Sequence, residues 1–148
     1  MSCFTFRARR PFHPARLHKL LKRGRLDNVI RSRGIVWVAT HPKESLQWNQ
    51  VGNSMNLSPG DAWHTAKLPV AQWPADVPNW ARTAAHGDRR IELGLVGMDA
   101  DVEAVRRVLS RAMCCLKLGG QTRLVCRKRG HRLAKIGDKL LILTIVLV

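Results

Sequence analysis

Histidine and cysteine are the side chains in this sequence best suited to binding a metal ion. Zinc sites need three or four such ligands, often in spacings such as C-x-x-C or H-x-x-x-H, and neither spacing occurs here. His13 and His18 lie five positions apart in a stretch expected to be helical, so they project about 140° apart around its axis. We therefore expect any metal bound by this chain alone to be weak, with His13, His18 and Cys114 as weak candidates. Three further histidines stand singly on separate segments: His41, His64 and His86.

The sequence also lacks the residue patterns of common catalytic centres. It contains no G-x-S-x-G nucleophile turn, no phosphate-binding G-x-x-x-x-G-K-[ST] loop, and no cysteine in a recognisable nucleophile setting. Asp61, Asp76 and Asp88 fall in turn-like segments, where a carboxylate is usually solvated or caps a helix. We therefore predict that this chain is not an enzyme on its own.

Positive charge is concentrated at the two ends of the chain. The formal net charge is +16, from 26 Lys and Arg against 10 Asp and Glu. Residues 1–33 carry ten basic residues and one acidic residue, a balance of +9, whereas residues 34–116 carry eight of each. Residues 117–148 carry eight basic residues and one acidic residue, a balance of +7. Such ends attract polyanions, including nucleic acid and acidic protein surfaces, without specifying a sequence.

Five tryptophans in a chain without tyrosine make the aromatic content distinctive. On a basic surface, tryptophans would suit stacking against single-stranded nucleic acid. These tryptophans fall in the neutral middle of the sequence, away from the arginine-rich ends. We therefore predict that they are buried or half-buried core residues: Trp37, Trp48, Trp63, Trp73 and Trp80.

Two amphipathic helices are expected from the spacing of apolar residues. The first begins at Pro14, whose missing N–H costs nothing in the first turn of a helix, and ends at Gly24. The second covers residues 98–116, is capped by Asp99 or Asp101, and places Cys114 and Cys115 on different sides of its axis. Much of the core is predicted to come from these helices and one strand, namely from Leu17, Leu20, Leu21, Val36, Val105, Leu109 and Met113.

Strands are predicted at 3–9, 34–40, 46–50, 54–58 and 89–97, with a further candidate at 62–66. Gly52-Asn53 and Pro59-Gly60 are interpreted as turns, and residues 68–85 as a long ordered loop rich in Pro, Trp and Ala. This order of elements predicts an α+β domain over residues 1–116. Its sheet should be antiparallel-rich, with four to five strands and both helices on one face.

Residues 117–148 form a basic tail with little periodicity and no predicted structure. The tail ends in an apolar nonamer, residues 140–148, which is an exposed β-type liability unless it docks. The nonamer is far shorter than the roughly 20 residues that a membrane-spanning helix needs. The four cysteines form no C-x-x-C pair and the first residues are no secretory signal, so reduced thiols and a cytoplasmic location are expected.

Four stretches of the sequence resemble, in order and spacing, the C-terminal domain of CobW-type proteins, the cobalamin-synthesis and zinc-chaperone GTPases. They lie within residues 4–116 and read FRARRPFHPARLHKLL (6–21), RSRGIVWVATHP (31–42), WNQVGNSMNLSPGDAW (48–63) and GDRRIELGLVGMD (87–99). In that family an N-terminal GTPase domain with a C-x-C-C motif drives metal delivery, and the C-terminal domain serves regulation, assembly or client contact. The resemblance thus implies a non-catalytic accessory domain that partners a CobW-type GTPase domain or a client metalloprotein, with zinc or cobalt as the metal.

The sequence departs from the family in two respects: it has neither a Walker lysine nor a C-x-C-C motif, and its tail does not follow the family's ending. GTP hydrolysis and tight metal loading are therefore not expected of it, and we hypothesise a truncated or frame-disrupted gene. The alternative function is that of a small basic protein binding nucleic acid non-specifically. The candidates for partner binding lie in the matching stretches and are Arg9, Arg10, His13, Arg16, Arg31, Arg89 and Arg90.

Overall fold

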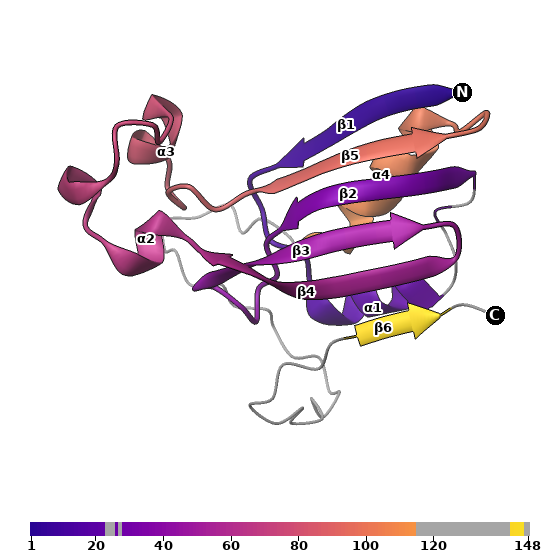
Figure 1. Cartoon of the computed structure of the whole chain (residues 1–148), viewed down its shortest axis with the longest axis horizontal. Helices are drawn as coiled ribbons and strands as arrows, with labels where there is room; N and C mark the ends of the chain where they lie inside the picture. The colour runs from indigo at the N-terminus through magenta and orange to yellow at the C-terminus, as the bar shows by residue number, and fades with distance from the viewer. Residues whose placement is uncertain (23–25, 27, 115–142, 147–148) are drawn as a thin grey trace.

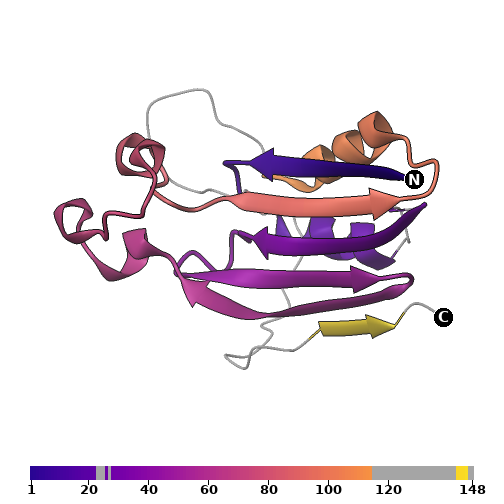
Figure 2. The ribbon, with the colours of Figure 1, turned by 45° about the horizontal axis from the view of Figure 1, so that its top comes forward.

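A six-stranded antiparallel sheet with two helices on one face forms the body of this protein (Figures 1 and 2). The structure is a computed structural model that describes residues 1–22, 26, 28–114 and, for the backbone, 143–146. The strand order is β1-β5-β2-β3-β4-β6, with every neighbouring pair antiparallel. The strands are β1 (Ser2–Ala8), β2 (Val29–Val36), β3 (Glu44–Val51), β4 (Ser54–Ala62), β5 (Ile91–Gly97) and β6 (Leu143–Val146).

Helices α1 (Pro14–Lys22) and α4 (Val102–Ala112) both cover the same face of the sheet (Figure 1). The predicted α+β class, the antiparallel sheet and the pair of helices on one face are therefore confirmed. Five strands come from residues 1–116, and β6 adds a sixth by pairing with β4. The division of the chain at residues 116 and 117 stays a prediction.

Side chains alternate across the sheet as the pleat of a β-strand requires. In β1, Phe4 and Phe6 face the helices, whereas Thr5 and Arg7 are exposed on the opposite face. All seven core residues predicted from the sequence are buried, although Met113 lies just after α4 rather than on it. Four of the five tryptophans are buried as well, and Trp80 is half-buried.

A chain of hydrogen bonds between buried polar side chains runs across β2 and β3 on the helix-covered face. The Trp48 Nε1–H donates to Ser32 Oγ at 2.7 Å, and that hydroxyl donates to Gln50 Oε1 at 2.6 Å. The amide of Gln50 then donates to the Gly52 carbonyl at 3.2 Å. Buried polar atoms are costly unless they are paired. These hydrogen bonds pair the side chains of Ser32 and Gln50, so both can lie among apolar neighbours.

The segment between β1 and α1 is clamped by backbone hydrogen bonds on both sides. The Phe12 N–H donates to Trp37 C=O at 2.8 Å, and the Ala39 N–H donates to Phe12 C=O at 3.0 Å. On the other side, the His13 N–H donates to Ala112 C=O and the Cys114 N–H donates to Pro11 C=O, both at 2.9 Å. Phe12 is fully buried and its ring stacks near Trp48, with centroids 6.4 Å apart.

The boundaries of the five predicted strands all differ from the observed ones, and those of β2 and β4 differ most. β2 begins at Val29 rather than at residue 34. The prediction missed these first residues because their alternation is made of polar side chains: Ser32 is buried between exposed Arg31 and Arg33. β4 continues through Pro59 and Gly60, so the predicted turn there is wrong. A register shift opposite these residues accommodates the proline. The predicted turn at Gly52-Asn53 is confirmed.

A lobe of short helices lies beyond one end of the sheet (Figure 1). It contains α2 (His64–Lys67), a 3-10 helix η1 (Val70–Gln72) and α3 (Asn79–Thr83), so the strand candidate at 62–66 is wrong after Ala62. The stretch at 68–85 is ordered but includes two short helices rather than loop alone. Its structure comes from a small separate cluster of buried residues, which amphipathic periodicity over so few residues does not reveal: Trp73, Val77 and Ala81.

Helix α4 is shorter than predicted because both of its ends are fixed by specific contacts. At its start, Asp101 Oδ1 accepts from the Ala104 N–H at 3.0 Å, so Asp101 rather than Asp99 is the cap. At its end, Met113 leaves the helix and forms an antiparallel bridge with Phe12. Cys114 therefore lies outside the helix, which contradicts its predicted place on the helix beside Cys115; Cys115 and Gly24 lie outside the described residues. No described helix is long and apolar enough to cross a membrane.

Replacing Leu109 with alanine should lower the free energy of unfolding by about 2–5 kcal/mol, because Leu109 is fully buried where α4 meets the sheet. Equilibrium unfolding in urea measures this loss. Met98→Ala is the control, since Met98 is 55% exposed and should cost about 0.5 kcal/mol or less. A loss for Leu109→Ala no larger than that of the control would contradict the packing of α4 on the sheet.

Candidate partner-binding site

Two of the predicted partner-binding residues, Arg9 and Arg90, come together in one pocket. The pocket has a volume of about 530 Å³ and lies where the end of β1 and the start of β5 meet the α3 region. We call it the arginine–tryptophan pocket; its charged and ring-bearing lining residues are Arg7, Arg9, Pro78, Trp80, Arg90 and Glu92.

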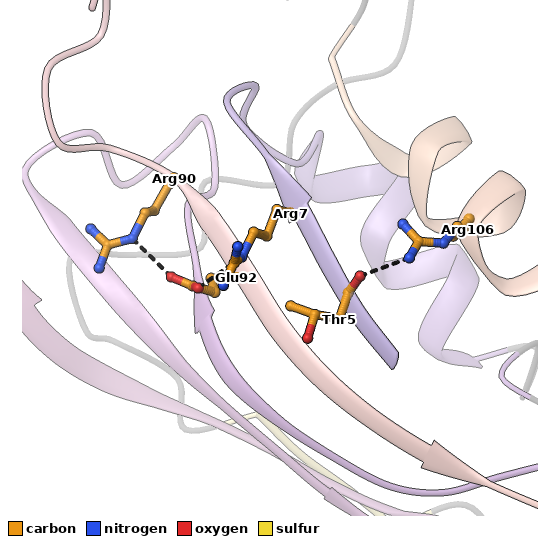
Figure 3. A network of polar contacts seen from close by, with 5 residues as sticks. All are labelled: Thr5, Arg7, Arg90, Glu92 and Arg106. Carbon is orange, nitrogen blue, oxygen red and sulfur yellow. Dashed lines mark hydrogen bonds and ion pairs between the residues drawn. The ribbon is translucent and has the colours of Figure 1, made fainter. Parts of the chain in front are cut away.

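Glu92 bridges two of the three guanidinium groups in the arginine–tryptophan pocket (Figure 3). Arg7 Nε lies 3.0 Å from Glu92 Oε1, and Arg90 Nε lies 3.2 Å from Glu92 Oε2. Arg90 also donates to the Asp88 carbonyl at 3.2 Å, which fixes its direction. Three guanidinium groups facing one carboxylate leave a formal charge of +2 in the pocket.

Trp80 provides an aromatic surface for the remaining arginine of the pocket. The guanidinium carbon of Arg9 lies 3.3 Å from the centroid of the Trp80 ring, and that of Arg90 lies 5.9 Å away. Stacking holds a guanidinium in place through the ring face and leaves its N–H donors available. Within the described part of the chain, Arg9 forms no ion pair.

Sequence reasoning missed the role of Trp80, and of Glu92 beside it. Trp80 was assigned to the neutral middle of the chain, apart from the basic ends, but the fold brings it into contact with Arg9, which lies 71 positions earlier. The separation of charge and aromatic residues in sequence is therefore not a separation in space. No spacing of nearby residues in the sequence indicates this contact, because it forms only when the lobe folds back toward β5.

The other predicted partner-binding arginines lie apart from this pocket. Arg89 turns away from it, donates to Pro42 C=O at 2.7 Å and lies over the Trp37 ring. Arg16 donates to Met113 C=O at 3.0 Å, a bond between α1 and the end of α4. Arg31 is exposed on β2, and Arg10 is half-buried after β1.

His13 is held within the turn that starts α1. Its Nδ1 accepts from the Ala15 N–H at 3.2 Å, and its carbonyl accepts from the Leu17 N–H at 2.9 Å. Partial burial and the neighbouring Arg16 charge lower the pKa of His13, so the imidazole is neutral at neutral pH. A neutral ring that accepts through Nδ1 suits a positional role in this turn.

The histidines and cysteines of the described residues do not gather into a metal site. No group of three or more His, Cys, Asp or Glu side chains within the described ranges has ligand geometry. His18 is exposed on α1, while Cys114 is half-buried beyond α4. His64 and His86 instead lie against the rings of Trp73 and Trp37.

Asp88 is the one buried carboxylate among the described residues. Its two oxygens accept from the backbone N–H groups of His64, at 2.8 Å, and Thr65, at 3.0 Å, and so cap α2. Burial raises the pKa of Asp88, but the hydrogen bonds from Thr65 and His64 lower it by more, so the pKa lies below its usual value. The capping role proposed for this residue from its turn-like setting agrees with these contacts.

A further arginine, Arg106, joins α4 to the outer strand β1 of the sheet. The Arg106 guanidinium on α4 donates to the Thr5 carbonyl of β1 at 3.0 Å (Figure 3). The guanidinium carbon of Arg106 also lies 5.7 Å from the centroid of the Phe4 ring. This contact fastens α4 to β1 on the side of the sheet away from the lobe.

These features define a small α+β domain that presents a basic pocket on its surface. The family model of the cobalamin synthesis protein cobW C-terminal domain matches residues 1–113. The chain therefore belongs to the CobW C-terminal domain family, as the four sequence stretches indicated. The match covers that domain and not a GTPase domain.

Two proteins whose names mention zinc are similar in sequence to part of this chain. A zinc-regulated GTPase metalloprotein activator of Dictyostelium discoideum is 33% identical over 102 residues, covering 64% of this chain and 21% of the relative. A zinc chaperone of Mycobacterium tuberculosis is 38% identical over 61 residues, covering 41% of this chain and 15% of the relative. This chain thus spans about a fifth or less of the length of these relatives.

Two solved structures of a zinc-bound YjiA GTPase share the fold. A triple mutant superposes with a TM-score of 0.53 and the Escherichia coli protein with a TM-score of 0.51. Each is 13% identical and overlaps 76% of this chain but 30% of the other. At that identity the likeness shows the fold alone.

Replacing Asp88 with asparagine should lower the free energy of unfolding at neutral pH by about 1–2 kcal/mol, because a charged acceptor of two backbone N–H groups is lost. The lowered pKa means that the unfolded chain binds the proton more readily. The stabilisation is therefore present above the ordinary aspartate pKa of about 4 and is lost as the pH falls through the folded-state value.

Urea unfolding from pH 7 to pH 2 checks this expectation, with the exposed Asp76→Asn in the same lobe as the matched control. The difference between the parent chain and Asp88→Asn should shrink below about pH 4. A difference that stays constant across this range would contradict the role of the Asp88 charge.

Zinc is the metal to test, because the relatives' names mention it, yet the described side chains do not fit a tight zinc site. We expect calorimetric titration of the full chain with zinc to give the same isotherm for the parent and for His13→Ala. His18→Ala serves as the matched comparison on the exposed side of α1. A stoichiometric site of about nanomolar affinity that disappears in His13→Ala would overturn this expectation.

Proposed function

We propose that this domain is a non-catalytic interaction module of a CobW-type zinc-chaperone system. It binds the GTPase domain of such a protein or a client metalloprotein, and it works in the cytoplasm. The observation that carries the proposal is the family match over residues 1–113, a region whose described surface includes a pocket with unbalanced positive charge.

The reactive side chains of the described residues serve structural hydrogen bonds, which supports a non-catalytic role. The buried carboxylate of Asp88 spends both oxygens on backbone N–H groups, which leaves it a structural cap. The His13 ring accepts a backbone hydrogen bond at the start of α1. Among the described residues, the Asp88 carboxylate and the His13 ring share no hydrogen-bond partner.

Nucleic-acid binding, the alternative considered from charge, receives no support from the comparisons. The relatives and solved structures carry names of GTPases and zinc chaperones. Four of the five tryptophans are buried, so they do not form a stacking platform for bases.

The full chain should form a saturable complex with the purified GTPase domain of a relative, such as the zinc-regulated GTPase metalloprotein activator of Dictyostelium discoideum. Biolayer interferometry measures this binding before and after nuclease treatment, and an unrelated P-loop GTPase is the control. We expect binding that survives nuclease and is absent with the control GTPase. No binding of that GTPase domain, or binding that nuclease abolishes, would contradict the proposal.

Salt dependence separates the two functions in the same assay. A protein that neutralises six to ten phosphates loses about a thousandfold or more in affinity between 50 and 200 mM salt. We expect the complex with the GTPase domain to weaken far less over this range, because the pocket contributes few net charges. A loss as steep as that for a single-stranded oligonucleotide would favour polyanion binding instead.

A further inference from the structure

We propose that the arginine–tryptophan pocket binds a carboxylate side chain from an acidic peptide segment of a protein partner. The inference rests on the proposed function for the existence of a protein partner, and it adds the chemistry of recognition. Arg9 is the principal anchor, Trp80 holds its guanidinium, and Arg90 supplies a second positive charge.

The pocket already binds one carboxylate, which belongs to the chain itself. Glu92 presents one oxygen to Arg7 and the other to Arg90, at 3.0 and 3.2 Å. The side chain of Glu92 is 36% exposed, so this ion pair lies at the wall of the pocket and in contact with solvent. The arrangement shows that guanidinium groups at this place hold carboxylates in hydrogen-bonding geometry.

Arg9 has the same chemistry without the internal partner. Its guanidinium lies against the Trp80 ring and forms no ion pair with the described residues. The planar fork of an arginine pairs with both oxygens of a carboxylate, and stacking against an aromatic ring reduces the conformational freedom lost on binding. Arg9 is thus pre-positioned for a ligand carboxylate.

The walls of the pocket favour a peptide over a phosphate-bearing ligand. Trp80 and Pro78 offer apolar surface that the methylene groups of a glutamate or a neighbouring side chain can cover. The carboxylate of Glu92 lies in the same pocket and repels an incoming anion.

The position of the pocket fits recognition of a short segment. Arg9 follows the end of β1, Arg90 precedes β5, and Trp80 belongs to α3, so three separate parts of the fold converge on a single recess. Arg89, the next basic residue, turns away to the Pro42 carbonyl.

Binding of a fluorescein-labelled hexaglutamate peptide to the full chain tests the proposal by fluorescence polarisation. Measurements at about 0.15 M salt, where the Debye length is about 8 Å, screen charges distant from the pocket. Arg9→Gln should weaken binding about tenfold, the effect of losing one charge-assisted contact. Arg107→Gln, an exposed arginine on α4 that removes the same charge, should change it less than about twofold.

Removal of the internal carboxylate provides the complementary test. Glu92→Gln should strengthen hexaglutamate binding severalfold, because it frees Arg7 and Arg90 and removes the repulsion. Glu103→Gln on α4 changes the net charge equally but lies in a helix away from the pocket, and it should have little effect. A gain of affinity cannot arise from a variant that fails to fold.

Equal weakening by Arg9→Gln and Arg107→Gln, or no strengthening by Glu92→Gln, would overturn the pocket assignment. An unlabelled oligothymidylate that binds more tightly than hexaglutamate, with the same dependence on Arg9, would also overturn it by favouring nucleic acid. Arg9→Gln also separates the two proposals. If this variant binds both hexaglutamate and the GTPase domain as tightly as the parent does, the pocket assignment fails and the proposed function stands. Failure of the parent chain to bind the GTPase domain would contradict the proposed function, whatever the result with hexaglutamate.

Discussion

The pairing of every backbone polar group from Pro11 to His13 is the constraint on which the rest of the domain depends. A buried backbone group left without a partner costs about 1–3 kcal/mol, so a segment buried at Pro11 and Phe12 must satisfy each one. Here the backbone groups of Trp37 and Ala39, which follow β2, pair with Phe12. At the end of α4, the backbone groups of Ala112 and Cys114 pair with His13 and Pro11. The same clamp sets where β1 ends, and therefore where Arg9 leaves the sheet to meet Trp80.

Much of the fold could be predicted because its core follows simple periodicities. The leucines of α1 and the Val105–Leu109 stripe of α4 follow the helical period, and Phe4 and Phe6 follow the strand period. The errors fall where burial depends on distant contacts. Ser32 is buried because Trp48 and Gln50 pair with it across strands, and no pattern of apolar residues reveals that partnership.

The candidate site was predicted in part, for the same physical reason. Arg9 and Arg90 were selected from basic residues within the family-like stretches, and the fold places both in one pocket. Trp80 was assigned to the core because aromatic burial is the usual outcome, and nothing near it in sequence indicates a stacked arginine. The metal candidates show the opposite case: adequate residue types, His13 and Cys114 among them, are present, but no group of three or more among the described residues could hold a metal ion.

The outer strand β1 carries a consequence for how copies of this domain behave together. An outermost strand exposes backbone groups that a strand of another molecule can pair with, which is a common route to aggregation. The guanidinium of Arg106 already occupies the Thr5 carbonyl, so an incoming strand would have to displace a charged donor and bury it. Two such edges brought together would also place like charges side by side, and this repulsion opposes the growth of a continuous sheet from one copy to the next.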